Sequence, residues 1–109
     1  MAMTIVVTRD VEDRYRGFLG SCMLELAPGV YTSPRMTRGV RERVWSVLTD
    51  WFGCLGHGSI VMTWSEPGLP GGQAVATLGV PAKDIAAIDG VLLARRDVPE
   101  SQAPHLKTE

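Results

Sequence analysis

Arginines are the side chains of this sequence best suited to bind a charged ligand. The 109-residue chain has a net charge of −1, but seven of its eleven basic residues lie within residues 9–43, and all seven are arginines. A guanidinium group presents a planar fork of donors that matches phosphate oxygens. Arg14, Arg16 and Arg38, together with Lys83 further along the chain, are therefore candidate phosphate contacts. Ordinary solvated charges on a helix surface would produce the same pattern, so charge alone leaves both interpretations open.

Asp10 is the carboxylate in the most suggestive place, because it directly follows a segment with the composition of a strand. Two copies of Asp10 facing each other in a dimer could hold one Mg²⁺, a hard cation that prefers oxygen ligands and polarises phosphodiesters. The same aspartate, or Asp13, could instead cap the helix that follows. His57 and His105 have no serine, cysteine or carboxylate at the spacing of a catalytic triad or metal site, and His57 is interpreted as a loop residue.

The elements that position these residues follow from the spacing of apolar side chains. Residues 4–8 are β-branched throughout and predict a strand, and a short strand is expected at 29–32, paired with 24–27. From Glu12 onward the apolar residues follow helical spacing, and this first helix is expected to stop before Pro28. Its predicted apolar stripe consists of Tyr15, Phe18, Leu19, Cys22, Met23 and Leu26.

A second helix is expected to begin at Ser33-Pro34 or at Thr37, and Gly53, Gly56 and Gly58 offer left-handed C-cap positions that end it. Arg38 and Arg41 lie off its apolar stripe and are expected on the positive surface. The predicted stripe consists of Val40, Val44, Val47, Leu48, Trp51, Phe52 and Leu55.

Strands are predicted at residues 59–64 and 73–80, and the tight-turn pair Asp89-Gly90 precedes one more strand. That last strand consists of Val91, Leu92, Leu93 and Ala94. This order predicts one α+β domain over residues 1–96, a ferredoxin-like β-α-β-β-α-β sandwich with an extra C-terminal strand. Residues 97–109 are polar, contain two prolines and are expected to form a flexible tail.

The predicted sandwich leaves one sheet face open, and we expect a second copy of the chain to cover that face in a homodimer. The strand at residues 91–94 could pair with the edge strand of the neighbouring protomer's sheet. Cys22 and Cys54 lie in apolar patterns and are expected to be buried thiols. No apolar run approaches the ~18 residues of a membrane span, and the N-terminal residues lack the pattern of a signal peptide. A cytoplasmic protein is therefore expected.

Several short segments, in order and with near-identical spacing, connect the sequence to a known family. They are Met3-Thr4-Ile5-Val6-Val7-Thr8, Arg14-Tyr15-Arg16-Gly17, Leu24-Glu25, Gly29-Val30-Tyr31, Arg41-Glu42, Val61-Met62-Thr63-Trp64, Leu78-Gly79-Val80 and Leu93. Through them, the stretch from Met3 to about Ala94 resembles the small CRISPR-associated adaptation proteins (Cas-two) of the type I-E systems.

The resemblance implies a ferredoxin-like homodimer that sits between dimers of a larger integrase subunit and lays protospacer duplex DNA across its surface. It implies phosphate contacts by Arg14 and Arg16, and by a loop pair that is Ala82-Lys83 here, so that one basic residue of the family pattern is missing. It also implies that the final strand, residues 91–94, docks onto the integrase subunit. Asp10 matches the metal-bound aspartate of relatives that are described as endonucleases.

The sequence therefore predicts a DNA-binding scaffold subunit of the CRISPR adaptation (spacer acquisition) integrase complex, and the scaffold role is favoured over catalysis. The alternative is a Mg²⁺-dependent endonuclease, acting on RNA or DNA through a pair of Asp10 carboxylates. A ferredoxin-like toxin relative that cleaves RNA is a third interpretation.

Overall fold

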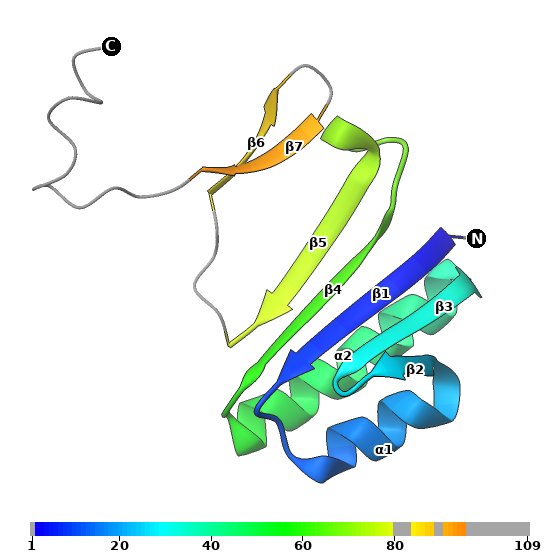
Figure 1. The fold of residues 1–109 in the computed structure, drawn as a ribbon, viewed down its shortest axis with the longest axis vertical. Helices are drawn as coiled ribbons and strands as arrows, with labels where there is room; N and C mark the ends of the chain where they lie inside the picture. Colours follow the sequence, from blue (N-terminus) through cyan, green and yellow to red (C-terminus); the bar gives the residue numbers. More distant parts are fainter. Residues whose placement is uncertain (1, 80–83, 89–90, 96–109) are drawn as a thin grey trace, which may run out of the picture.

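The computed structural model describes residues 2–79, 84–88 and 91–95 (Figure 1). These residues form two α-helices, one short 3-10 helix (η1) and seven strands, and the order matches the predicted one except for β6, which the sequence analysis missed. The elements are β1 (Ala2–Arg9), α1 (Asp13–Cys22), β2 (Leu24–Ala27), β3 (Val30–Met36), α2 (Arg38–Leu55), β4 (Ser59–Ser65), η1 (Pro70–Gly72), β5 (Gln73–Leu78), β6 (Asp84–Ile88) and β7 (Val91–Arg95).

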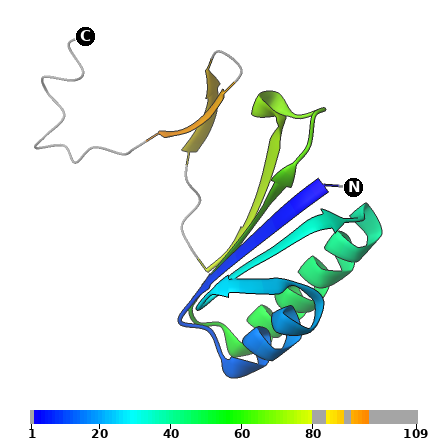
Figure 2. The same cartoon turned by 45° about the vertical axis from the view of Figure 1, so that its right-hand side comes forward.

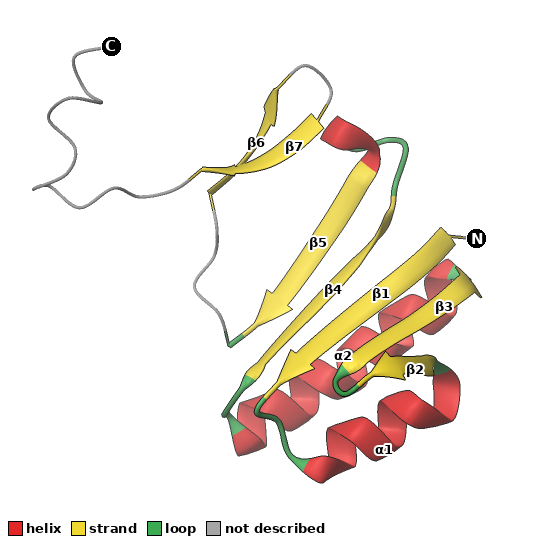
Figure 3. Ribbon diagram, viewed as in Figure 1, coloured by secondary structure: helices red, strands yellow, loops and turns green. Residues whose placement is uncertain are grey.

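Five strands form one antiparallel sheet in the order β2-β3-β1-β4-β5. Both helices pack on the same face of this sheet (Figures 1 and 2), and the helices and strands alternate as expected for a ferredoxin-like fold (Figure 3). β6 and β7 pair antiparallel with each other in a separate two-stranded sheet that contacts η1. The predicted α+β class and sandwich architecture are thus confirmed for the described residues, whereas the tail at 97–109 lies outside them.

The hydrophobic core lies between the helices and the sheet. Tyr15 and Leu19 of α1 and Leu48 of α2 are at most 1% exposed and face Val6 and Tyr31, which pair across β1 and β3. The core residues are Val6, Tyr15, Leu19, Met23, Tyr31, Met36, Val44, Leu48, Ile60 and Met62. Because the helices approach from one side only, alternate residues of each strand point to the other, uncovered face.

The uncovered sheet face is apolar along its centre. Met3 and Val7 of β1 are 52% and 41% exposed, and Val75 of β5 is 38% exposed. In the register of the sheet, Val7 lies between Val30 and Val61. This surface, which carries Met3, Val7, Val30, Val61 and Val75 and is named here the open face, is the one that the predicted dimer would bury.

The first helix is shorter than predicted. It ends at Cys22, because Met23 is already extended and the next residues join β2, which pairs with β3. Leu26, expected on the apolar stripe, lies instead on this edge strand and is 61% exposed. Cys22 and Cys54 are also exposed and free, so the prediction of buried thiols is wrong. Helical spacing alone placed the end of the helix too late, whereas the predicted pairing of residues 24–27 with the next strand is confirmed.

The second helix begins at Arg38, as one of the two predicted starts requires. Thr37 is its N-cap, and the Thr37 hydroxyl accepts a hydrogen bond from the Val40 N–H. Ser33-Pro34, the other predicted start, lies inside β3. No helix among the described residues combines the length and the apolar character needed to cross a bilayer.

Glycines hold three chain segments in close contact beside Asp10. A β-carbon on Gly58 (φ 85°) would lie 2.5 Å from the Arg9 carbonyl oxygen and closer still to that of Asp10. A β-carbon on Gly79 (φ 78°) would collide with the carbonyl of Gly58 and the ring of Phe52. The end of β1, the loop after α2 and the end of β5 therefore meet where only glycine fits.

Candidate nucleic-acid interface

Helix α1 displays Arg14 and Arg16 on its two flanks. Tyr15, the residue between them, is 1% exposed and points into the core. Successive residues of an α-helix are rotated by about 100°, so the neighbours of a buried residue emerge on opposite sides of the helix. Both arginines are exposed. Both members of the predicted pair are thus exposed, but their side chains leave α1 on opposite flanks.

Arg14 lies on the face of an aromatic ring from the other helix. Its guanidinium carbon is 5.1 Å from the centroid of Trp51. The Trp51 ring meets Tyr15 edge-on at 5.5 Å and an interplanar angle of 82°, and it meets Phe18 at 5.4 Å and 67°. Trp51 was predicted only as part of an apolar stripe, and its contact with a candidate phosphate ligand could not be read from the local sequence.

Arg16 is held by a carboxylate from β2. Its Nη2 donates to Glu25 Oε2 at 3.2 Å, and the Gly29 N–H donates to the same oxygen at 3.1 Å. The Gly29 N–H and the positive charge of Arg16 hold the pKa of the Glu25 carboxyl below its ordinary value, against the opposing effect of desolvation. The Arg16 side chain remains 51% exposed. Since a guanidinium has five N–H donors, the pair leaves others free for a phosphate.

Arg38 extends the exposed positive surface at the start of α2. Its side chain is 81% exposed, and Nε donates to Glu42 one turn later at 3.3 Å. An exposed ion pair of this kind contributes little to stability and leaves most of the guanidinium accessible to solvent. The placement of Arg38 agrees with its predicted exposure.

Arg41 is not on the surface where it was expected. It is 7% exposed, and its guanidinium carbon lies 4.5 Å from the centroid of the Trp64 ring of β4. Its Nη2 is 3.9 Å from Glu66 Oε1, which also accepts a hydrogen bond from the Trp64 indole N–H. Val40, expected to be buried, is 45% exposed. The buried face of α2 therefore starts from Arg41, because Trp64 offers this cation an aromatic surface.

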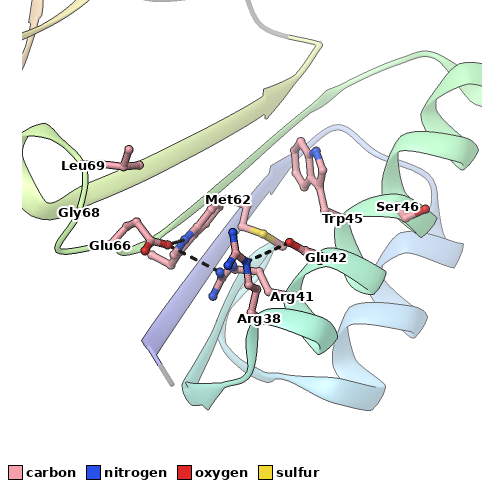
Figure 4. Close-up of a pocket in the computed structure, with 10 residues that line it drawn as sticks. Arg38, Arg41, Glu42, Trp45, Ser46, Met62, Glu66, Gly68 and Leu69 are labelled. Carbon is pink, nitrogen blue, oxygen red and sulfur yellow. Dashed lines mark hydrogen bonds and ion pairs between the residues drawn. The ribbon is translucent and has the colours of Figure 1, made fainter.

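A groove of about 610 Å³ opens over this buried arginine, between α2 and the residues that follow β4 (Figure 4). Trp45 and Met62 line its apolar side, and Leu69 lies on the opposite rim. The charges within the groove are paired, Arg38 with Glu42 and Arg41 with Glu66. The groove is therefore electrically balanced, in contrast to the Arg14 flank of α1, whose guanidinium is in none of the ion pairs found among the described residues.

Asp10 lies at the exposed end of β1 in the left-handed conformation, with φ 57°. Neither Asp10 nor Asp13 is the N-cap of α1, because that position belongs to Glu12, whose side chain makes no capping hydrogen bond. His57 Nε2 lies 3.3 Å from Glu12 Oε1, a contact that the sequence analysis missed. Among the described residues, no three His, Cys, Asp or Glu side chains are grouped so that they could hold a metal ion.

The remaining predicted site residues lie toward the C-terminus. Lys83 falls outside the described residues. Residues Val91, Leu92, Leu93 and Ala94 form most of β7, which confirms the predicted strand. Their pairing partner within the chain is β6, so that β7 belongs to a hairpin set apart from the five-stranded sheet.

A comparison of the sequence with protein families identifies the family of the chain. The profile of a family described as CRISPR-associated protein (Cas_Cas2CT1978) matches residues 3–93. The match starts within β1 and ends within β7, so it includes both helices and all of the five-stranded sheet except Ala2. The resemblance to the Cas-two family is thereby confirmed. The chain belongs to this family of CRISPR-associated proteins.

Proposed function

We propose that the chain is the DNA-binding scaffold subunit of a CRISPR adaptation integrase complex of type I-E, in which a homodimer holds protospacer duplex DNA. The observation that carries this proposal is the exposure of Arg14 and Arg16 on the two flanks of α1. Contacts between arginines and phosphates position a protein on a duplex without reading its sequence. Membership of a CRISPR-associated family supports the same biological setting.

The divergence of the two arginines favours contacts with separate phosphates. Their side chains leave α1 on opposite sides of the buried Tyr15, and each is steadied by a different neighbour, Trp51 or Glu25. Arg38 would add a further contact from α2, and Lys83 is the remaining candidate. Each phosphate that is neutralised releases counterions, so binding in this proposal is strongly dependent on salt and weakly dependent on sequence.

The open face supports the proposed homodimer. An antiparallel sheet can leave one face to solvent, but that face is then usually polar. Here the face carries the apolar side chains of Met3, Val7 and Val75, each more than one-third exposed. A second copy related by a twofold axis would pack its own open face against this one, and the dimer would present two copies of α1 to one duplex.

Light scattering on the protein as it elutes from a column is expected to give the mass of two chains. The variant Val75→Lys is expected to shift the mass toward one chain, whereas Val40→Lys, which changes an exposed valine of α2, is not.

The hairpin formed by β6 and β7 is the proposed docking site for the integrase subunit. Its two strands pair only with each other among the described residues, so their outer edges could accept a strand from a partner. Co-purification with a tagged integrase subunit tests this assignment. The full-length chain is expected to be retained and a variant ending before Val91 is expected to be lost, whereas equal retention would contradict it.

The DNA-binding assignment is tested with variants matched in charge. Arg14→Ala/Arg16→Ala removes two positive charges from the flanks of α1, and Arg35→Ala/Arg43→Ala removes two from other exposed sites. Affinity is measured for duplexes of unrelated sequence at one salt concentration. The first variant is expected to weaken binding to every duplex, and the control variant is expected to bind nearly as the parent does. Equal losses in both variants would mean that bulk charge, rather than this surface, binds DNA.

A Mg²⁺-dependent endonuclease remains the alternative proposal, favoured by the placement of Asp10. Its left-handed backbone and the glycine contact at Gly58 hold this carboxylate at an exposed strand end. A single carboxylate is too small a ligand set, and the described part of one chain does not group Asp10 with two further His, Cys, Asp or Glu side chains, so this proposal depends on a second Asp10 across a dimer. Cleavage of RNA or DNA that both EDTA and Asp10→Ala abolish would support it, and cleavage that survives Asp10→Ala would refute it.

A further inference from the structure

We infer that Trp51 is a positioning residue that holds the Arg14 guanidinium in place for a DNA phosphate. The inference rests on the proposed function and deepens it, because it assigns to a residue of α2 a part in phosphate binding by α1. The contact that suggests it is the 5.1 Å separation between the Arg14 guanidinium carbon and the centroid of the Trp51 ring.

The orientation of the Trp51 ring is fixed by its surroundings. Tyr15, which is 1% exposed, meets the ring nearly perpendicularly at 5.5 Å. Phe18, one turn further along α1, meets it at 5.4 Å. Edge-to-face contacts of this kind are favourable arrangements of aromatic rings. The ring is thus a rigid platform between the two helices, and Arg14 lies on it at the surface.

An aromatic platform positions a cation without neutralising it. A guanidinium attracted to a ring face keeps its full charge, and the N–H groups along its edge remain available to donate hydrogen bonds to a phosphate. Arg16 differs, because its ordering partner Glu25 is a carboxylate 3.2 Å away that also repels phosphate. The ion pairs found among the described residues do not include Arg14. The two flanks of α1 therefore order their arginines by different means, and only the Arg16 guanidinium is ion-paired with a carboxylate among the described residues.

Ordering of the Arg14 side chain by Trp51 also lowers the entropic cost of binding a phosphate. A free arginine side chain has many rotamers, most of which are lost when it contacts a phosphate. Stacking on Trp51 removes part of that freedom before DNA arrives. Removing the ring should therefore weaken binding by about two- to fivefold for each Arg14 that contacts DNA, the range expected for an exposed cation–π contact.

The test is a double-mutant cycle read out by binding to a labelled mixed-sequence duplex at fixed salt. Trp51→Met removes the ring but keeps a large apolar side chain, and it is placed in the parent, Arg14→Ala and Arg16→Ala backgrounds. We expect it to weaken binding in the parent and in the Arg16→Ala background but to have no further effect when Arg14 is absent. Trp51→Phe, which keeps a ring, is expected to restore most of the affinity, and Trp45→Met is the control for loss of another α2 tryptophan.

The outcomes separate this inference from the proposed function. An equal loss for Trp51→Met in the Arg14→Ala background, or no loss in the parent, overturns the positioning role while leaving DNA binding by Arg14 intact. If Arg14→Ala itself does not weaken binding, both proposals fall. If Trp51→Met does not fold, an NMR measurement on the unaltered protein tests the same contact. The Arg14 side-chain protons should show an upfield NMR shift from the ring, and its absence overturns the inference.

Discussion

Replacing Gly58 by alanine is expected to destabilise the protein strongly. The residue has φ 85°, and its new β-carbon would lie 2.5 Å from the Arg9 carbonyl oxygen and 2.6 Å from the Asp10 carbonyl carbon. The left-handed backbone costs an alanine roughly 1 kcal/mol. Relief of the collision adds about 2 kcal/mol, because the obstacle is backbone rather than the end of a flexible side chain. We therefore expect a free energy of unfolding lower by about 3 kcal/mol, and a midpoint of thermal unfolding lower by more than about 10 °C.

Gly17→Ala is the matched control for this prediction. Gly17 lies inside α1, and a β-carbon there would meet nothing within 4 Å. Alanine should stabilise the helix by about 1 kcal/mol, because it loses less backbone entropy on folding. Both variants are compared with the parent by circular dichroism during urea and thermal unfolding, at equal chain concentration. Unfolding of Gly58→Ala at the same denaturant concentration as the parent would refute the claim that three segments meet there without room for a side chain.

Three further perturbations follow from the contacts described above. Arg41→Ala should lower the free energy of unfolding by roughly 2 kcal/mol, because a desolvated cation–π contact and the packing of the side-chain stem are lost. A change below about 0.5 kcal/mol, measured by urea unfolding, is the size usual for a surface substitution and would contradict the buried placement of Arg41. Glu25 has a pKa held below its ordinary value of 4.5, first by the Gly29 N–H and also by Arg16. Its contribution to stability is therefore present above pH 4.5 and is lost as the pH falls through the lower pKa of the folded state. The difference in the midpoint of thermal unfolding between the parent and Glu25→Gln should therefore shrink on acidification. A difference that stays constant with pH would count against this. Cys22 and Cys54 should both react with a thiol reagent in the folded protein, because both are exposed. Partial desolvation raises the pKa of the Cys22 thiol and should slow the reaction of Cys22 near neutral pH. Protection of both thiols until the protein unfolds would support the original expectation of buried cysteines.

The sheet and the helices could be predicted because their signals are local. The β-branched run of β1 and the Thr37 cap with the apolar spacing of α2 each specify an element without reference to the rest of the chain. β6 was missed because its sequence, Asp-Ile-Ala-Ala-Ile, contains weak strand formers, and pairing with β7 stabilises it. The end of α1 was misplaced for a similar reason, since its apolar spacing continues into residues that pair with β3.

The candidate site could be predicted only in part. Arg14 and Arg16 were correctly expected on the surface of α1, because the buried Tyr15 lies between them. Their ordering by Trp51 and Glu25 depends on contacts between residues far apart in sequence, which periodicity does not encode. Arg41 shows the same limit in the opposite direction. Its place off the predicted apolar stripe led to the expectation of exposure, but the ring of Trp64 across the fold provides a buried position for it.

The most direct test of the central claim is the salt dependence of duplex binding. The logarithm of the association constant is measured against the logarithm of salt concentration for the parent and for Arg14→Ala/Arg16→Ala. If each arginine neutralises one phosphate, the magnitude of the slope should fall by about 1.8 for every chain bound to the duplex. An unchanged slope would show that these two guanidinium groups do not contact the DNA backbone, and would contradict the account.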